Sequence, residues 1–464
     1  MLFNSIEYFY FFVVAYLFYW ALAKKQLVFQ NAFLLVSSYV FYGWWDYRFL
    51  GLIFISTVID FFLAKQIYTI QESQIKKLLL SLSLCVNLGL LAFFKYYNFF
   101  IDSWVELLTS VGYEFNSITT LEIILPVGIS FYTFQTLSYT IDVYYGRLKP
   151  SKSFINFATF VSLFPQLVAG PIERARNLLP QLEQPRTFSK SLLLQGLYLM
   201  LWGLFKKIVI ADSLAPLTDK VFEDPSLYNG GTLLLGLLYF TFQIYCDFSG
   251  YSDIAIGTAK CFGFQFKTNF NFPYFAQNIS DFWRRWHMSL SNWFRDYIFI
   301  PLGGSKVSTI KFIRNILVVF LVSGLWHGAN WTYVFWGLTH ALIYFITQYI
   351  KLPIHSSGFK NIVTTCFTFI AVMIAWVFFR SPTISFAFEY LTDLVMRFSI
   401  PQYPLKGLYY IFILLFFDFC FRTNPQHIFK GFSSFQKQLS IIVFIAFIWV
   451  HFSSSPKNFI YFQF

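Results

Sequence analysis

Apolar residues occur in long blocks along this chain, and polar residues gather in short stretches between the blocks. Most blocks have about 17 to 25 residues, the length that a helix needs to span a bilayer. We therefore predict an all-α polytopic membrane protein with about eleven to thirteen membrane segments, some of which do not cross fully. The candidate segments cover residues 6–23, 27–43, 49–70, 78–101, 123–145, 154–170, 192–212, 231–249, 312–326, 331–350, 360–379, 405–421 and 438–454.

Composition supports this class and argues against a soluble domain. Of the 464 residues, 57% are hydrophobic and only 12% are charged, whereas a soluble domain carries about 25% charged residues. No internal repeat, linker or low-complexity tract stands out in the sequence. We predict a single membrane domain over residues 1–464, with its functional core at about 123–345.

The basic residues indicate an orientation in the bilayer. The net charge is +12, and Lys and Arg lie mostly between apolar blocks, as expected where cytoplasmic loops are enriched in them. Three loops of matching parity are basic, and they contain Lys24 with Lys25, residues 65–77 and residues 147–152. The loop over residues 102–122 instead holds four acids and no Lys or Arg. We predict that the N-terminus lies outside, and no nucleic-acid partner is expected.

Several kinds of site are not supported by the sequence. The five cysteines form no CxxC pair, so neither a zinc site nor a disulfide framework is predicted, and we expect no metal. The phosphate-loop pattern GxxxxGK[ST], the zinc motif HExxH and the nucleophile elbow GxSxG are all missing.

The segment over residues 281–304 has helical spacing and ends at Pro301, Gly303 and Gly304. We predict a helix that begins near Asp281, and we expect Asp281 to be its N-cap or an acid of its first turn. Its apolar face consists of Trp286, Leu290, Trp293, Tyr297 and Ile300, while Arg284, Arg285 and Asn292 fall off that face. An amphipathic helix lying on the membrane surface is an equally good interpretation of this segment alone.

Two histidines are the candidate chemical groups. His287 lies within this segment, and His327 ends a later apolar run, between Trp326 and Gly328. A partly desolvated imidazole stays neutral and is then a ready proton acceptor. Gly324 and Gly328 permit close approach of a helix or a ligand. The alternative is that His327 only hydrogen-bonds a neighbouring helix.

Other polar residues in apolar surroundings receive structural interpretations. His340 is predicted to be structural, and His355, His427 and His451 to be interfacial because they lie near segment ends. Asp247 and Asp253 flank Gly250 near the end of a span. They are candidates for helix caps, partners of arginines or coordinating groups, and capping or pairing is favoured.

Six motifs are spread over nearly the whole chain: FPQLVAGPI at 164–172, YCDFSGYSDIAIG at 245–257, NFNFPY at 269–274, RWHMSLSNWFRDYIFIPLGG at 285–304, SGLWHGANWTYVFWGLTHA at 323–341 and FIYFQF at 459–464. In these motifs the sequence resembles the membrane-bound O-acyltransferases, and within them the bacterial branch that includes the alginate and peptidoglycan O-acetyltransferase membrane subunits. The block with two histidines is the most specific part of the resemblance.

The resemblance implies a fold and roles for the two histidines. It implies a ring of tilted helices around a thin central region, with a cytoplasmic funnel and an extracytoplasmic opening. His327 matches the catalytic histidine of the family, and His287 its second polar position. Cys246 and Asn330 stand where relatives commonly have apolar residues.

The expected reaction is transfer of acetyl from cytoplasmic acetyl-CoA, with His327 as base and no bound cofactor, for O-acetylation of an exported polysaccharide. A basic region could attract the phosphates of the donor, although positive-inside bias alone also explains it. The resemblance favours the bacterial inner membrane and a periplasmic SGNH or esterase-like partner. D-alanyl transfer and a transporter or flippase remain alternatives. The candidate donor-binding residues are Arg284, Arg285, Arg295, Trp286 and Asn292.

Overall fold

The computed structural model describes residues 1–22, 26–113, 121–168, 170–349, 359–453 and 457–462. Within those ranges every regular element is a helix, which confirms the predicted all-α class. Lys24, Lys25, His355 and the last two residues of FIYFQF lie outside the described residues. The helices are α1 (Ile6–Leu22), α2 (Leu27–Asp46), α3 (Leu50–Thr69), α4 (Ser73–Leu91), α5 (Tyr97–Ser110), α6 (Ile129–Tyr144), α7 (Phe154–Ser162), α8 (Phe164–Leu167), α9 (Ala175–Leu182), α10 (Lys190–Leu204), α11 (Asp212–Glu223), α12 (Gly230–Cys261), α13 (Ile279–Arg285), α14 (Met288–Phe294), α15 (Thr309–His327), α16 (Trp331–Tyr349), α17 (Phe359–Arg380), α18 (Ile384–Met396), α19 (Lys406–Phe421) and α20 (Ser434–His451).

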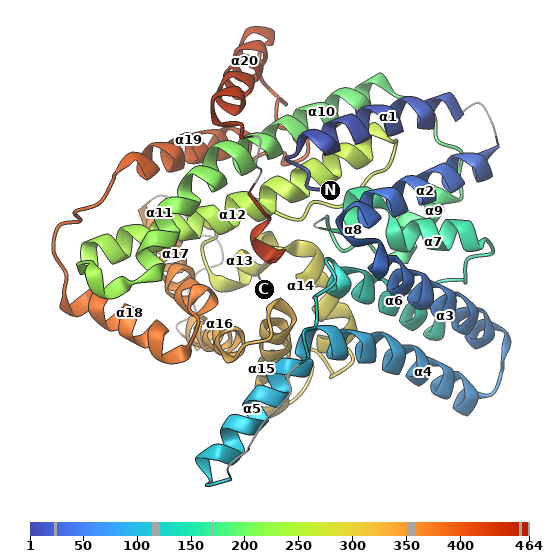
Figure 1. The fold of residues 1–464 in the computed structure, drawn as a ribbon, viewed down its shortest axis with the longest axis horizontal. Helices are drawn as coiled ribbons and strands as arrows, with labels where there is room; N and C mark the ends of the chain where they lie inside the picture. Colours follow the sequence, from blue (N-terminus) through green and yellow to red (C-terminus); the bar gives the residue numbers. More distant parts are fainter. Residues whose placement is uncertain (23–25, 114–120, 169, 350–358, 454–456, 463–464) are drawn as a thin grey trace. The chain divides into compact units, whose positions relative to one another are not determined.

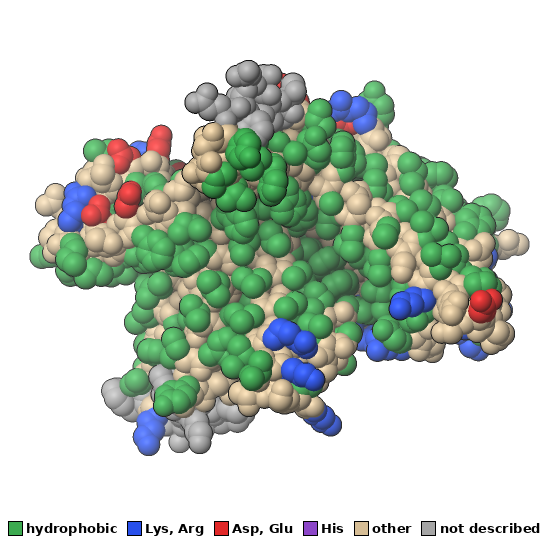
Figure 2. Space-filling model, turned by 90° about the horizontal axis from the view of Figure 1, so that it is seen from below, with side chains coloured by type: hydrophobic (Ala, Val, Ile, Leu, Met, Phe, Trp, Pro, Cys, Tyr) green, Lys and Arg blue, Asp and Glu red, His purple; other side chains and the backbone are tan. Residues whose placement is uncertain are grey.

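The helices have the length and surface of membrane segments. Among the described residues, seven helical stretches are long and apolar enough to cross a bilayer. Large apolar side chains are widely exposed on them, such as Trp449 at 83% and Val450 at 77% on α20. Figure 2 shows one face on which apolar side chains predominate and charged ones are few. The protein is therefore a multi-pass membrane protein, while the number of crossings and the orientation stay predictions.

The described residues group into two compact units. The first contains mainly residues 9–189, and the second contains mainly residues 2–8, 190–261 and 265–464. The single domain over residues 1–464 stays a prediction.

In the first unit, α3, α4 and α6 pack together (Figure 1), and α2 packs on α7. The buried Asp60 of α3 accepts hydrogen bonds from Ser83 and from Asn87 Nδ2, the latter at 2.8 Å. Such bonds satisfy a carboxyl group that burial would otherwise penalise. The predicted segment 154–170 is interrupted at Leu163, next to Pro165 in the first turn of α8. A proline lacks the N–H that a continuing helix needs.

In the second unit, α10 and α12 run side by side (Figure 1). A Cβ on Gly203 of α10 would lie 2.6 Å from the carbonyl oxygen of Gly250 on α12, so only glycine allows this approach. Nearly all of α12 is buried, which agrees with its apolar residues on every side. The few charged groups of α12 therefore lie inside the protein.

Candidate functional site

His327 ends α15, next to two glycines at which α15 and α16 approach each other closely. Its side chain is buried, with 2% of its surface exposed. A Cβ on Gly324 would lie 2.2 Å from the carbonyl oxygen of Tyr333, and one on Gly328 would lie 2.1 Å from the Tyr333 ring. The two glycines therefore allow α16 to pack closely against α15. This agrees with the prediction that they permit close approach of a helix or a ligand.

Aromatic rings enclose the imidazole of His327. The ring centroids of Trp326 and Trp336 both lie 5.0 Å from it, that of Phe379 at 5.4 Å and that of Tyr461 at 5.6 Å. These rings come from α15, α16, α17 and the C-terminal segment. A surrounding of this kind offers little solvation to a charge, so the site suits a neutral imidazole.

His287 connects α13 to α14 and is completely buried. Its Nδ1 lies 3.3 Å from Asn269 Oδ1 and 3.4 Å from Ser289 Oγ. Its ring packs edge-on against Phe248 with a centroid distance of 4.6 Å. Burial lowers the pKa of His287 to about 3, so the ring is neutral at physiological pH.

The backbone of His287 has an uncommon conformation. Its φ is 42°, in the left-handed region that side-chain-bearing residues seldom adopt. Such a conformation costs about 1–3 kcal/mol and persists where surrounding contacts impose it. Here the contacts are hydrogen bonds from Met288 N to Asn269 O at 2.9 Å and from Asn271 N to Arg285 O at 2.9 Å.

The prediction of one continuous helix over residues 281–304 was therefore wrong. The helix breaks at Trp286, which is extended, and His287, because the chain at Asn269 takes over backbone hydrogen bonds that a helix would have made. Asp281 does lie in the first turn of α13, and Asn278 is its cap. On the predicted apolar face, Trp286, Leu290 and Trp293 are buried, whereas Ile300 is 52% exposed.

The structure brings the two histidines to one aromatic cluster. The centroid of the Trp326 ring lies 5.7 Å from that of His287 and 5.0 Å from that of His327, so this ring is a neighbour of both histidines. Two other rings also connect the histidines. The centroid of the Phe248 ring lies 4.6 Å from that of His287 and 4.4 Å from that of Tyr461. The sequence motif that carries His287 and the one that carries His327 thus meet in the second unit.

Among the candidate donor-binding residues, Trp286 joins this aromatic cluster through the ring of Phe270, which lies 5.1 Å from Trp286 and 6.3 Å from His287. Arg285 pairs with Asp281 at 2.8 Å and Arg295 with Asp296 at 2.8 Å. Arg284 is exposed and Asn292 is half-buried. Trp286 is fully buried, 5.1 Å from the ring of Trp376.

The acids of α12 pair with two adjacent lysines. Lys207 Nζ lies 2.8 Å from Asp247 and 2.9 Å from Asp212, and Lys206 Nζ lies 2.6 Å from Asp253. The predicted pairing was right, but the partners are lysines of the π-helical turn Phe205–Ala211 rather than arginines. No group of acids, histidines and cysteines suited to a metal occurs among the described residues.

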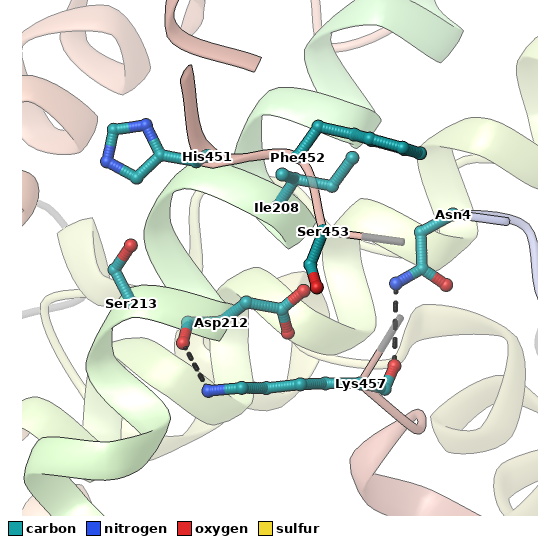
Figure 3. A pocket seen from close by; sticks show the side chains of 8 residues that line it. All are labelled: Asn4, Ile208, Asp212, Ser213, His451, Phe452, Ser453 and Lys457. Carbon is teal, nitrogen blue, oxygen red and sulfur yellow. Dashed lines mark hydrogen bonds between the residues drawn. The ribbon is translucent and has the colours of Figure 1, made fainter. Parts of the chain in front are cut away.

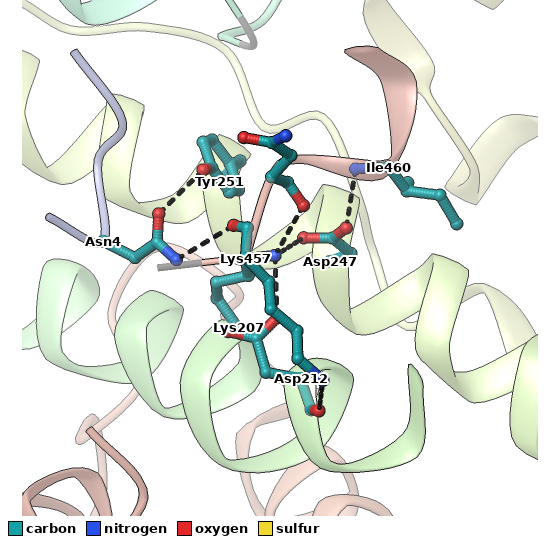
Figure 4. A network of polar contacts seen from close by, with 8 residues as sticks. Asn4, Lys207, Asp212, Asp247, Tyr251, Lys457 and Ile460 are labelled. Atoms are coloured by element: carbon teal, nitrogen blue, oxygen red, sulfur yellow. Dashed lines mark hydrogen bonds and ion pairs between the residues drawn. The ribbon is translucent and has the colours of Figure 1, made fainter. Parts of the chain in front are cut away.

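These ion pairs also hold the C-terminal segment (Figure 4). Ile460 N donates to Asp247 Oδ2 at 2.8 Å, and Lys207 Nζ donates to Asn458 O at 3.2 Å. Lys457 Nζ donates to the carbonyl oxygen of Asp212 at 2.7 Å. The segment that carries Tyr461 to His327 is thus attached to α12 and to the start of α11.

Comparison with known proteins assigns the family. The family model described as MBOAT, membrane-bound O-acyltransferase family, matches residues 148–391. A probable alginate O-acetylase of Azotobacter vinelandii is 40% identical over 392 residues, 84% of this chain and 77% of the relative. This chain belongs to the membrane-bound O-acyltransferase family.

Two further relatives of the acyltransferase differ in how much of this chain they match. A peptidoglycan O-acetyltransferase of Helicobacter pylori is 36% identical over 403 residues, 81% of this chain and 75% of the relative. A teichoic acid D-alanyltransferase of Bacillus subtilis is 31% identical over 229 residues, 47% of this chain and 57% of the relative. Similarity to the O-acetyltransferases thus extends over much more of the chain.

Sequence reasoning missed residues of the acyltransferase that the structure places in or next to its histidine cluster. Tyr461 belongs to the motif FIYFQF, but this short segment has no periodicity that would indicate a position near His327. Lys206 and Lys207 did carry a signal, because two adjacent lysines inside a predicted membrane segment are costly and need partners.

A polar cavity of about 130 Å³ lies beside the ion pairs of the acyltransferase (Figure 3). Asp212 and Ser213 from the start of α11, His451 at the end of α20 and Lys457 line it, with Asn4 of the N-terminal segment. His451 thus lies at a helix end, as predicted. The cavity adjoins the attachment of the C-terminal segment rather than the imidazole of His327.

His340 lies in the same aromatic cluster of the acyltransferase, because the ring of Trp336 lies 4.7 Å from His340 and 5.0 Å from His327. Its ring stacks nearly parallel to Phe282 and Phe320, at centroid distances of 6.2 and 6.1 Å. Neither of its ring nitrogens has a hydrogen-bond partner among the described residues. This packing favours the structural role predicted for it.

Proposed function

We propose that this acyltransferase moves an acetyl group from acetyl-CoA to a hydroxyl group, for O-acetylation of an exported polysaccharide. The observation that carries the proposal is the enclosed imidazole of His327, joined to His287 through Trp326. The acetyl group and the polysaccharide acceptor are favoured by the O-acetyltransferase relatives, which match 81% to 84% of this chain.

His327 acts as the general base of the transfer. One ring nitrogen takes the proton of the acceptor hydroxyl, and the oxygen attacks the carbonyl carbon of the thioester. The carbon–sulfur bond then breaks, and the sulfur leaves as a thiol with the proton that the imidazole returns. The products are the acetyl ester of the acceptor and the free thiol of coenzyme A. Acetyl-CoA is a substrate of this reaction, which needs no bound cofactor.

His287 supports the reaction as a neutral, fixed polar group. Its pKa of about 3 keeps it uncharged at physiological pH, and its Nδ1 contacts Asn269 and Ser289. These contacts and the left-handed backbone fix the ring, whose centroid lies 5.7 Å from that of Trp326. There it orients a reactant or steadies the oxygen that gains charge.

The donor approaches from the cytoplasm and the acceptor from outside, so that the charged carrier never crosses the bilayer. Arg284, Arg285 and Arg295 bind phosphates of the donor, with Trp286 and Asn292 nearby. Because Arg285 and Arg295 already pair with Asp281 and Asp296, phosphate binding has to compete with these carboxylates. Location in a bacterial inner membrane, an outside N-terminus and a periplasmic SGNH or esterase-like partner belong to the same proposal.

Two other functions make different predictions. D-alanyl transfer draws on the teichoic acid D-alanyltransferase, whose similarity extends over 47% of this chain. A transporter or flippase would need no thioester chemistry.

The test uses the purified full chain in lipid nanodiscs with acetyl-CoA labelled in the acetyl group. We expect thioester consumption that depends on the protein and on an added alcohol or glycan acceptor. Intact acetyl-CoA with transport of a glycan would support the transporter, and consumption only of a D-alanyl carrier protein would support D-alanyl transfer. Either result would overturn the proposed reaction. Loss of O-acetyl esters from the surface polysaccharide of a deletion strain would identify the acceptor.

A further inference from the structure

A second cavity lies at the beginning of α20, where this helix meets α10. Its volume is about 260 Å³, and α10 and α20 are in contact in the second unit (Figure 1). Its lining combines two residues of α10, a loop before α20 and one residue of the first turns of α20. These residues are Gln195, Tyr198, Gln426, His427, Ile428, Phe429, Lys430 and Lys437.

The lining is positively charged. Lys430 is exposed, and Lys437 lies over the ring of Tyr198 with its Nζ 4.2 Å from the centroid. The eight lining residues include no acid, and the sequence contains no Asp or Glu after Asp418. An anion placed here therefore meets cations without a competing carboxylate from the lining.

A third lysine adds positive charge next to the cavity. Lys260, at the end of α12, donates to the carbonyl oxygen of Gln426 at 3.1 Å. Partial burial and the nearby charges of Lys260 and Lys430 lower the pKa of His427. Burial is the larger cause of this shift, and the charges of the two lysines add to it in the same direction.

The outer face of α20 makes the site amphiphilic. The part of α20 that follows Lys437 exposes large apolar side chains, with Ile442 at 64%, Ile445 at 53% and Trp449 at 83%. Exposed apolar surface of this kind on a membrane helix contacts acyl chains. A free phosphate would use only the basic lining, whereas a phospholipid would use both the lining and the apolar face.

We propose that this cavity binds the phosphate of an anionic phospholipid, with its acyl chains along α20. Lys430 and Lys437 contact the phosphate, while Tyr198 fixes the ammonium group of Lys437 through its ring. Basic pockets between membrane helices bind such headgroups on the cytoplasmic side, which is the side that the charge rule predicts for this lysine-rich end. The site is independent of His327 and of the proposed acetyl transfer.

The test measures lipid retention by native mass spectrometry of the full chain released from nanodiscs. The nanodiscs contain equal amounts of phosphatidylglycerol and phosphatidylcholine. We expect preferential retention of phosphatidylglycerol by the wild type, and a loss of about 10- to 30-fold in Lys430→Gln/Lys437→Gln. Lys430→Arg/Lys437→Arg should retain the lipid because it keeps both charges.

The matched control is Lys76→Gln/Lys77→Gln, which removes two charges from α4 in the first unit and should leave retention unchanged. Equal loss in this control would mean that only net charge matters, and would overturn the site. Equal retention of both lipids by the wild type would overturn it too. So would displacement of phosphatidylglycerol by millimolar inorganic phosphate, because the cavity would then be a simple anion site.

Discussion

Ile460 N donates a hydrogen bond to the Asp247 carboxylate at 2.8 Å, which joins the end of the chain to the middle of the buried helix α12. Tyr461, the next residue, lies with its ring 5.6 Å from that of His327. The carboxylate of Asp247 is in turn paired with Lys207. This buried ion pair thus holds the segment whose Tyr461 ring packs near the imidazole of His327.

Lys207→Met tests this attachment. The substitution leaves Asp212 and Asp247 without their common cation, and breaking such a buried pair costs about 3–5 kcal/mol. We expect a clearly lower apparent melting temperature in detergent, and weaker acyl transfer from the fraction that remains folded, since Tyr461 is less firmly placed. Lys207→Arg keeps the charge and should retain most of the stability. Wild-type melting of Lys207→Met would show that the ion pair does not hold the segment.

The buried His287 predicts a pH-dependent stability. Its pKa is about 3 in the folded protein, lowered from 6.5 by burial. Between these two values the unfolded chain binds a proton that the folded protein does not, so stability is complete above about pH 6.5 and falls as the pH falls toward 3. The contribution of one group is at most about 1.4 kcal/mol per pH unit.

His287→Gln removes this titration. Melting temperatures of wild type and variant, measured from pH 7 to pH 4, should therefore differ in slope, with the shallower decline in His287→Gln. Parallel declines would contradict the assignment of this part of the slope to His287. In the same preparations we expect acetyl transfer to be reduced about 100-fold or more, and unchanged turnover would leave His287 only a structural role.

Gly324→Ala tests the close contact between α15 and α16. Its methyl group would lie 2.2 Å from the carbonyl oxygen of Tyr333, whereas Gly89→Ala on α4 meets no atom within 4 Å. We expect Gly324→Ala to cost about 1–3 kcal/mol and to reduce activity, because α15 carries His327. Gly89→Ala is the control and should be neutral or slightly stabilising. Equal behaviour of the two variants in thermal melting and turnover would contradict the packing argument.

The sequence predicted the helical membrane class, because apolar blocks are local signals, and it singled out the two motifs that carry His287 and His327. It did not predict the break at His287, where hydrogen bonds from the distant residue Asn269 override a regular helical pattern. For Asp247 it favoured helix capping or pairing with arginines, whereas the partner in the structure is Lys207. The position of Tyr461 beside His327 depends on a hydrogen bond from its short segment to Asp247. A contact of this kind leaves no periodic pattern in the sequence.

The central claim is that His327, and not merely a buried histidine, performs the transfer. The most direct measurement gives His327 and His340 the same substitution to phenylalanine and compares acetyl transfer from labelled acetyl-CoA in nanodiscs. Phenylalanine suits the stacked position of His340 between Phe282 and Phe320, so His340→Phe should keep most of its activity. We predict that His327→Phe folds and inserts but transfers about 1% of the wild-type rate or less. Wild-type transfer by folded His327→Phe would contradict the account.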